Sequence, residues 1–402
     1  MKHHLEDIVK NDLCLGCGLC QSVTQEKIKL IIDDRGFYKP LFDKIDSQDE
    51  AKVLRVCPAI NVENDNCKSA SIWGEYKSAV NAWAKDSLVR HKASSGGVIS
   101  ALAIFLLESK QVDGVLQVGV SNDSYLYNRL YVSKSREDVL RCSSSRYAPA
   151  PLFKDIIALL DTTPDSTYAF VGKPCDIAGI KNLIKEYPQY RNRIKYYLSI
   201  FCAGMPSYNA TEKAISTFGH QGVPSTLKYR GDGWPGYFAV TYSDGTIHKM
   251  TYNESWGKIL GRSLTYRCKI CPDGIGMLAD ISTGDSWNTK NGYPDFTEAD
   301  GMNFCFIRTE AGFALFNEAV KNGYIDSETL NVSQVKTIQN YQYTRRQYVG
   351  WRIAVTQFAT NSILNFQKLG YYKNALKSNV AKGIKHAYGT YLRLRKQQKQ
   401  KS

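Results

Sequence analysis

Four cysteines near the start of the chain have the types and the spacing of cluster ligands. Cys14, Cys17 and Cys20 are separated from one another by two residues each. Another 36 residues separate Cys20 from Cys57, which is followed by Pro58. Three thiolates at this spacing converge on one iron–sulfur cluster, and the glycines between them let backbone N–H groups approach the sulfurs. The long gap before Cys57 raises the entropy of loop closure only logarithmically. The pattern predicts a 4Fe–4S cluster on these four cysteines, with a tetrahedral zinc site as the alternative.

Four further cysteines form a second, scattered set. Cys175 and Cys202 each follow a predicted strand, and Cys268 and Cys271 form a C-x2-C pair that ends in Cys-Pro. Side chains beyond the carboxyl ends of neighbouring strands meet at one edge of a sheet. A second cluster on these four cysteines is therefore feasible, and ordinary buried thiols explain Cys175 and Cys202 equally well. The cysteines without a matched partner are interpreted as structural: Cys67, Cys142 and Cys305.

Three short segments offer hydroxyls, flexible backbone or cations that suit a phosphate group. Their residues are Ser94, Ser95, Gly96 and Gly97, then Ser144, Arg146 and Tyr147, then Gly172 and Lys173. Taken alone, the first segment is more typical of an ordinary helix N-cap, and the second is equally typical of a polar surface loop. Asp280, Asp285 and Trp287 either bound a cofactor pocket or serve as turn and core residues. The absence of a Walker-type loop and of a well-placed G-x-G-x-x-G argues against a nucleoside triphosphatase and an ordinary Rossmann dehydrogenase.

An α/β framework is predicted to position these motifs. Residues 1–70 are rich in cysteine and poor in regular pattern, which indicates a ferredoxin-type 4Fe–4S domain. Within residues 75–310, apolar strand patterns alternate with helical ones and then give way to a β-rich stretch, which predicts an α/β core. Residues 311–402 are predicted to form a mostly helical, strongly basic extension.

Composition narrows the class of protein. The chain has 402 residues, 43% of them hydrophobic, and its 11 cysteines occur in a long sequence whose start carries no apolar leader. Disulfide scaffolds are typical of short secreted chains, so we expect a cytoplasmic protein with reduced cysteines. The longest apolar stretch, 98–107, is too short to span a bilayer.

The net charge of +14 belongs to one end of the chain. Residues 341–402 contain 13 of the 52 Lys and Arg residues and no Asp or Glu, which leaves 39 basic against 38 acidic residues elsewhere. Such a tail suits an acidic partner, a membrane surface or nucleic acid, or it is a solvated terminus. Because the body of the chain is nearly neutral, the charge does not indicate a nucleic-acid-binding protein.

Nine segments in this order resemble the coenzyme F420 (deazaflavin) hydrogenase/dehydrogenase beta-subunit family. The resemblance covers residues 10–310 and runs through these segments: 14–20, 57–58, 94–97, 144–147, 172–175, 201–207, 229–234, 268–271 and 279–287. It implies an FAD-binding α/β core beside 4Fe–4S clusters, with Cys175, Cys202, Cys268 and Cys271 as the second ligand set. It also implies that Ser94–Gly97, Ser144, Arg146, Tyr147, Gly172 and Lys173 contact the flavin.

The chain departs from the family's pattern in its N-terminal cysteines and its tail. Many relatives carry two N-terminal cysteine runs, whereas here the second run is reduced to Cys57, so one N-terminal cluster is expected. Nothing in the sequence identifies the acceptor as the deazaflavin, and the tail from residue 341 lies outside the resemblance.

The sequence thus predicts an iron–sulfur flavoprotein oxidoreductase. The resemblance implies electron transfer between a ferredoxin-like donor or partner subunit, the clusters, FAD and a small organic acceptor. Two alternatives stay open: a non-catalytic 4Fe–4S electron-transfer adaptor for a partner enzyme, and a zinc-stabilised binding protein. No catalytic acid or base is predicted, because none of the six histidines falls in these motifs.

Overall fold

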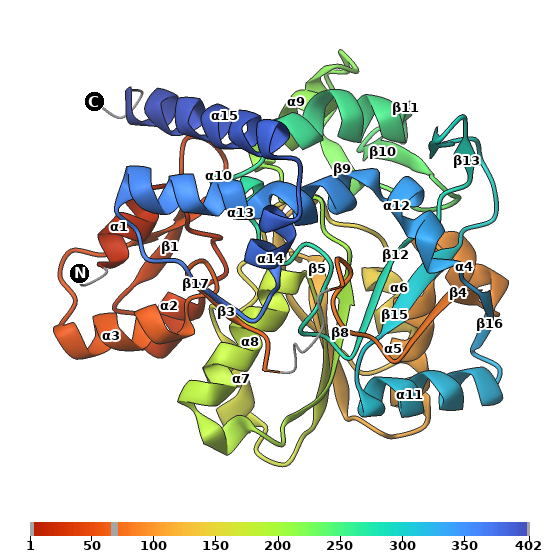
Figure 1. Ribbon diagram of the computed structural model, residues 1–402. Coiled ribbons are helices and arrows are strands. Elements are labelled where there is room, and N and C mark those ends of the chain that lie inside the picture. Colours follow the sequence, from red (N-terminus) through yellow and green to blue (C-terminus); the bar gives the residue numbers. More distant parts are fainter. Residues whose placement is uncertain (1–3, 66–70, 400–402) are drawn as a thin grey trace.

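An eight-stranded mixed sheet forms the centre of the protein, whose computed structural model describes residues 4–65 and 71–399 (Figure 1). The strand order is β16-β4-β15-β12-β8-β7-β5-β6. In chain order the strands are β4 (Ser78–Ala84), β5 (Gly114–Val120), β6 (Asn128–Ser133), β7 (Tyr168–Gly172), β8 (Ile194–Ile200), β12 (Ile281–Asp285), β15 (Asn303–Ile307) and β16 (Ile325–Thr329). The predicted α/β class is confirmed. Cys67 lies outside the described residues.

The directions of the strands bring several chain segments to one edge of the sheet. β5, β7, β8 and β12 run parallel to one another. β4 is antiparallel to β15, which is antiparallel to β12, so β4 has the same direction as the parallel strands. The carboxyl ends of all five strands therefore share one edge, where ligand sites of open α/β sheets form.

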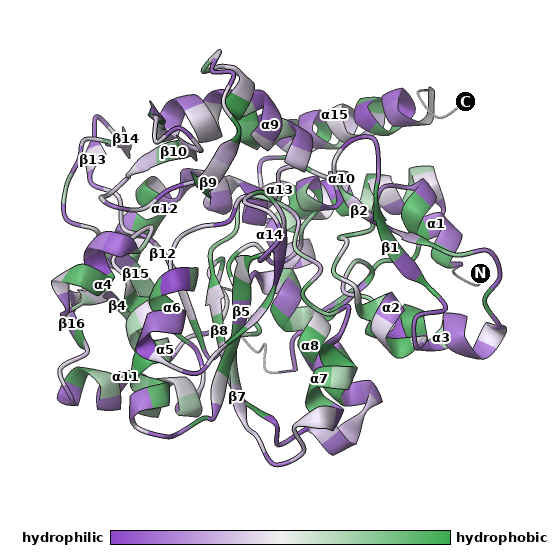
Figure 2. Ribbon diagram, turned by 180° about the vertical axis from the view of Figure 1, so that it is seen from behind, coloured by the Kyte–Doolittle hydropathy of each residue, from purple (hydrophilic) through white to green (hydrophobic). Residues whose placement is uncertain are grey.

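Helices cover both faces of this sheet (Figure 1). α5 (Val98–Glu108) and α11 (Glu310–Lys321) pack on one face, and α7 (Ile156–Thr162) and α8 (Pro174–Glu186) pack on the other. Consecutive residues of one strand contribute to opposite cores: Val115 packs with α5, whereas Leu116 packs with α8. This follows from the two-residue period of side chains along a strand. Viewed from behind, hydrophobic residues recur along α5, α8 and the central strands (Figure 2).

The N-terminal region shares the core of the α8 face. It contains α1 (Leu5–Lys10), α2 (Leu19–Val23), the antiparallel pair β1 (Lys29–Ile32) and β2 (Tyr38–Leu41), α3 (Ser47–Val56) and β3 (Asn61–Glu63). One continuous apolar cluster joins Leu5 and Leu19 of this region to Ile177 of α8. β3 pairs in parallel with β17 (Asn365–Gln367), and this pairing joins the N-terminal region to the C-terminal part of the chain. The ferredoxin-type assignment and the boundary at residue 70 stay predictions.

A small three-stranded sheet and a helical layer complete the fold. The sheet has the order β11-β10-β9, with β9 (Pro224–Lys228), β10 (Tyr237–Tyr242) and β11 (Ile247–Thr251), and α9 (Tyr208–Ser216) contributes to its core. The helical layer consists of α12 (Val335–Ile338), α13 (Asn340–Thr360), α14 (Tyr371–Leu376) and α15 (Val380–Lys399). Within the described residues, no helix combines the length and the apolar content needed to cross a bilayer.

The helical prediction for residues 311–402 missed two strands. β16 lies at the edge of the main sheet and pairs only with β4, and just its first residue, Ile325, is buried. β17 has three residues and one buried side chain, Phe366. Short strands with one buried residue carry too little alternation for a sequence pattern to reveal them.

Arg346 of α13 is a fully buried link between three loops. Its guanidinium donates to the carbonyl oxygens of Ile72, Pro272 and Leu369 at 2.7–2.9 Å. We expect Arg346→Met to lower the free energy of unfolding by about 3 kcal/mol or more, because three carbonyls lose their donors. Urea unfolding measures this, and Arg395→Met, at an exposed position, should change the value by less than about 0.5 kcal/mol. Equal effects of the two substitutions would contradict the linking role.

Candidate functional site

The four N-terminal cysteines line one pocket. Cys14, Cys17 and Cys20 come from the turn before α2 and from its first residues, and Cys57 follows the last residue of α3. Gly16 and Gly18 adopt left-handed backbone angles, with φ of +64° and +92°. A Cβ on Gly16 would lie 2.7 Å from the Tyr38 carbonyl oxygen, and one on Gly18 would lie 2.5 Å from the Lys154 nitrogen. The turn between the cysteines therefore requires glycine at both positions.

Backbone N–H groups point at the sulfurs of this pocket. The Gly16 N–H donates to Cys14 Sγ at 3.3 Å. The pKa of Cys57 is raised to about 12, chiefly by burial and next by the Cys14 thiolate, while the N–H groups of Ala59 and Ile60 act in the opposite direction. Buried thiols so close together are poor thiolates on their own, and a bound cation deprotonates them. The pocket thus has the donors and the electrostatics of a metal-cluster site.

A buried ion pair stands beside the first cysteine. Lys39 Nζ lies 3.0 Å from Asp12 Oδ1 and also donates to the Cys14 carbonyl oxygen at 3.4 Å, and Arg35 forms two further bonds to the Asp12 carboxylate. Burial raises the pKa of Cys14, whereas the Lys39 charge lowers it. A positive charge at this position favours the thiolate form that binds metal.

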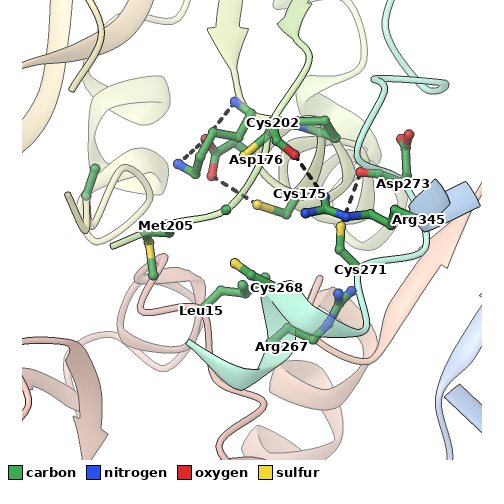
Figure 3. A pocket seen from close by; sticks show the side chains of 14 residues that line it. Leu15, Cys175, Asp176, Cys202, Met205, Arg267, Cys268, Cys271, Asp273 and Arg345 are labelled. Carbon is green, nitrogen blue, oxygen red and sulfur yellow. Dashed lines mark hydrogen bonds and ion pairs between the residues drawn. The ribbon is translucent and has the colours of Figure 1, made fainter. Parts of the chain in front are cut away.

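The second cysteine set also lines one pocket, shown in Figure 3. Cys175 lies in the first turn of α8, Cys202 follows β8, and Cys268 lies in α10 (Tyr266–Lys269) with Cys271 just beyond it. These segments are separated in the sequence by up to 96 positions, counted from Cys175 to Cys271. The carboxyl ends of β7 and β8 bring the first two together, as the strand argument predicts. The structure therefore gathers all four residues of the predicted second ligand set.

Cationic side chains surround the second pocket. Lys173, Arg267 and Arg345 line it together with the cysteines. Figure 3 shows the two arginines. Burial lowers the pKa of Lys173, but the Asp176 carboxylate, 2.6 Å away, outweighs it and raises the pKa above its usual value. The pKa of Cys202 is raised to about 12, chiefly by burial and next by Cys268, while the Lys173 charge acts in the opposite direction. Buried cations at this position would stabilise a negatively charged group bound in the pocket.

The two pockets are neighbours. Leu15 lines both of them. Arg267, which is 1% exposed and precedes Cys268, donates to the carbonyl oxygens of Ala59 at 2.6 Å and of Pro58 at 3.2 Å, just after Cys57. One guanidinium thus contacts the loops of both cysteine sets. The sequence reasoning missed Arg267, although its position directly before a C-x2-C pair is a usable signal.

The cysteines surround pockets and do not converge on a point. Within the described part of the chain, no group of three or more His, Cys, Asp or Glu side chains is placed to hold a single metal ion. A tetrahedral zinc site would need four ligand atoms about 2.3 Å from one centre. An iron–sulfur cluster is larger than a single zinc ion, so the four thiolates that bind it lie further apart from one another.

The predicted flavin segment 94–97 is tied to the start of β15. Ser95 Oγ donates to the Met302 carbonyl oxygen at 3.1 Å and accepts a bond from Asn303 Nδ2 at 3.0 Å. Asn303 Oδ1 in turn accepts from the Val98 N–H, the first of α5. Gly96 is buried, and a Cβ there would lie 2.6 Å from the Asn303 nitrogen. The segment touches the second predicted one, since the Ser145 N–H donates to Ser94 Oγ.

Protein groups accept most of the hydrogen bonds that the Arg146 guanidinium can donate. It donates to Asn128 Oδ1 and to the carbonyl oxygens of Leu227, Tyr125 and Leu126, and it lies 5.0 Å from the centre of the Tyr229 ring. These bonds leave little donor capacity for the pyrophosphate of a flavin. Arg146 therefore fits a structural role better than the expected clamp.

Other predicted flavin residues also have protein neighbours. Tyr147 packs its ring 4.8 Å from that of Trp256. Ser144 has φ of 138° and lies near Gly231, whose Cβ would be 3.4 Å from that of Ser144. The Gly172 carbonyl oxygen accepts from Ser199 Oγ, and Lys173 lines the second cysteine pocket. The structure thus groups the first two segments and assigns Lys173 to the cysteines.

A buried ion pair lies at the end of β12, between Asp285 and Arg230, of which the sequence reasoning missed Arg230. Arg230, 2% exposed, forms two bonds to the Asp285 carboxylate at 3.0 and 2.6 Å. The Trp234 indole N–H donates to the same carboxylate at 2.9 Å, and the Trp234 ring stacks on Trp287 at 4.7 Å. The Gly233 N–H donates to the His91 carbonyl oxygen at 3.1 Å, so this loop adjoins the one that leads to Ser94. Asp285, the last residue of β12, and Trp287, just beyond it, thus contact the glycine-rich loop 230–236.

Comparison with known proteins decides the family. Two sequence profiles match: "Coenzyme F420 hydrogenase/dehydrogenase, beta subunit N-term" over residues 79–156 and the corresponding "C terminus" profile over residues 165–333. The chain is also 30% identical over 268 residues to "Coenzyme F420 hydrogenase subunit beta" of Methanococcus voltae, covering 66% of this chain and 88% of that protein. The chain belongs to this family. The family profiles include the second cysteine set, whereas the first set and helices α13 to α15 lie outside them.

Other members of the family are oxidoreductases, which gives this chain a redox role. "Coenzyme F420-dependent sulfite reductase" of Methanocaldococcus jannaschii is 25% identical over 357 residues, covering 85% of this chain and 50% of that protein. The fold is similar to a chain of the "F420-reducing [NiFe] hydrogenase complex from Methanosarcina barkeri", with a TM-score of 0.55 and 20% identity, covering 75% of this chain and 97% of that chain. The structural likeness supports the mixed α/β fold of the family.

Asp285→Asn tests the buried pair. Removing one charge leaves Arg230 buried beside a neutral amide, so we expect the free energy of unfolding to fall by about 3–5 kcal/mol. Denaturant titration measures this, and Asp232→Asn, which loses only an exposed partner of Lys228, should cost less than about 1 kcal/mol. A small loss in Asp285→Asn would show that the pair does not hold the loop.

Proposed function

We propose that this protein is an iron–sulfur flavoprotein subunit that carries two 4Fe–4S clusters. The observation that carries the proposal is the grouping of eight cysteines into two sets of four around neighbouring pockets. The first cluster would be held by Cys14, Cys17, Cys20 and Cys57, and the second by Cys175, Cys202, Cys268 and Cys271. A 4Fe–4S cluster, when bound, accepts and donates single electrons.

The surroundings of both pockets fit such a group. N–H groups lower the pKa of Cys57, of Cys17 through Leu19, and of Cys268 through Met205, after burial and the neighbouring thiolates have raised these values. Hydrogen bonds to the sulfurs and nearby cations are the means by which proteins set the potential of a cluster. Arg267 and Arg345 hold the cysteine loops in position and keep positive charge beside them.

Zinc is the alternative for each set of four thiols. A single zinc ion would require the four sulfurs to approach one centre to within about 2.3 Å. Metal analysis distinguishes bound zinc from an iron–sulfur cluster.

A flavin site at the carboxyl edge of the sheet is the second part of the proposal. Its support is the meeting of residues 94–97, Ser144 and the glycine-rich loop 230–236 at this edge. Arg146 is left out of the site because protein groups occupy its donors. FAD supplies both one-electron and two-electron chemistry when bound, and the chain's contribution would be to enclose and orient it.

Electron transfer to and from other molecules completes the proposed function. The relatives named as hydrogenase and formate dehydrogenase beta subunits support a partner subunit or a ferredoxin-like protein as donor. A small organic molecule is the proposed acceptor. The single experiment that identifies it is anaerobic reduction of the purified, reconstituted protein followed by a screen of acceptors for reoxidation.

Metal analysis of cysteine variants tests the two clusters. Anaerobically purified protein should be brown and contain about eight iron and eight sulfide atoms per chain, and Cys57→Ala and Cys202→Ala should each lose about four of each. Cys142→Ala is the matched control, since Cys142 lines neither pocket, and it should keep the full content. Colourless protein containing stoichiometric zinc would overturn the proposal.

Flavin analysis distinguishes the proposed flavoprotein oxidoreductase from a non-catalytic electron-transfer adaptor. We expect about one FAD per chain in the same preparation, released by denaturation and identified by fluorescence and chromatography. Reconstitution with excess FAD guards against loss during purification. Iron-loaded protein that binds no flavin under these conditions would favour the non-catalytic electron-transfer adaptor.

A further inference from the structure

Helix α15 lies at the periphery of the protein and packs on α13 through one side only (Figure 1). On that side, Gly383 fits against Trp351, and the His386 ring stacks on Tyr348 at 4.6 Å. Thr390 and Leu394, one and two turns further along, are buried. These contacts fix which face of the helix points away from the protein.

An apolar stripe occupies part of the outer surface of α15. Val380, Ile384, Tyr388 and Leu392 recur every four residues and are 59, 57, 62 and 49% exposed. Residues four apart lie one above the other on a helix, so the four side chains form a continuous stripe that winds slowly around it. An exposed series of this kind differs from single surface apolar residues, which need no explanation.

Basic side chains flank the stripe. Lys382, Lys385, Arg393, Arg395 and Lys396 are exposed on the same helix. Residues 341–402 contain no Asp or Glu, and the remainder of the chain has 39 basic against 38 acidic residues. The net positive charge is therefore concentrated in the C-terminal segment that includes this helix. Because both family profiles end by residue 333, the surface lies outside the core that the family shares.

We propose that α15 docks the protein on an anionic phospholipid surface. The stripe would lie at the boundary of the acyl chains, with the flanking Lys and Arg on headgroup phosphates and Tyr388 at the interface. This occupant matches both features of the helix. Nucleic acid would match the charge but leave an aliphatic stripe exposed, and a purely acidic protein surface would do the same. The proposal does not depend on the clusters or the flavin.

Vesicle sedimentation with the full chain tests the docking. We expect binding to phosphatidylcholine vesicles that contain phosphatidylglycerol, little binding to phosphatidylcholine alone, and a strong reduction at about 1 M salt, where charges are screened within about 3 Å. Failure of the full chain to bind the anionic vesicles at low salt overturns the proposal.

Two sets of substitutions separate the stripe from the charge. Ile384→Ser with Leu392→Ser should weaken binding at least about tenfold, since buried CH₂ groups contribute to partitioning. Lys382→Gln, Lys385→Gln and Lys396→Gln together should weaken it by at least a similar factor. The matched control changes three exposed lysines elsewhere, Lys134, Lys213 and Lys321, to Gln and should stay within about twofold. Circular dichroism verifies that every variant keeps its helices.

The same variants identify a different occupant. Binding that is lost with the lysines but unaffected by the serine pair, and that short duplex DNA or a polyglutamate peptide competes away, overturns the lipid surface in favour of a polyanion. Vesicle binding that survives both sets of substitutions places the contact elsewhere and also overturns the proposal.

Discussion

Buried guanidinium groups hold the loops that carry the cysteines, and the candidate site depends on them. Loops lack the ladder of bonds that satisfies strands and helices, so their buried carbonyl oxygens need other donors. Arg267 donates to the loop after Cys57, and Arg345 donates to the carbonyl oxygen of Cys202. Arg308 donates to the carbonyl oxygen of Ile275, in the loop beyond the C-x2-C pair. The cysteine positions are thus set by side chains distant in the sequence.

These arginines also explain why the thiols can be buried. Burial and mutual repulsion raise the pKa of Cys17 and of Cys202, which disfavours thiolates in an empty pocket. Positive charge nearby and N–H groups aimed at sulfur act in the opposite direction. Two neighbouring pockets with these properties form one electrostatic unit, and Arg267 contacts the loops of both. The redox role of the family and the chemistry of the pockets therefore agree.

The sheet supplies the second constraint, because it brings loops of the N- and C-terminal parts of the chain to one edge. The ends of β7 and β8 deliver Cys175 and Cys202, and the end of β12 delivers Asp285. Arg230 then fastens the glycine-rich loop to Asp285, next to the loop that leads to Ser94. The second cysteine pocket and the proposed flavin site consequently lie along one rim.

By itself, the sequence predicted the α/β class and the family, because strand–helix alternation and short motifs are local patterns. It predicted the first cysteine set from ligand spacing, whereas the second set followed from the family resemblance. It indicated that the basic charge belongs to the C-terminal part. Only the tertiary structure decided which groups the individual arginine side chains bind. Arg146 was predicted to bind a phosphate, but its guanidinium donates to backbone carbonyl oxygens. Arg267 was not predicted to have a role, yet it contacts the loops of both cysteine sets. A guanidinium reaches partners far away in the sequence, so its role depends on which carbonyls folding leaves without donors.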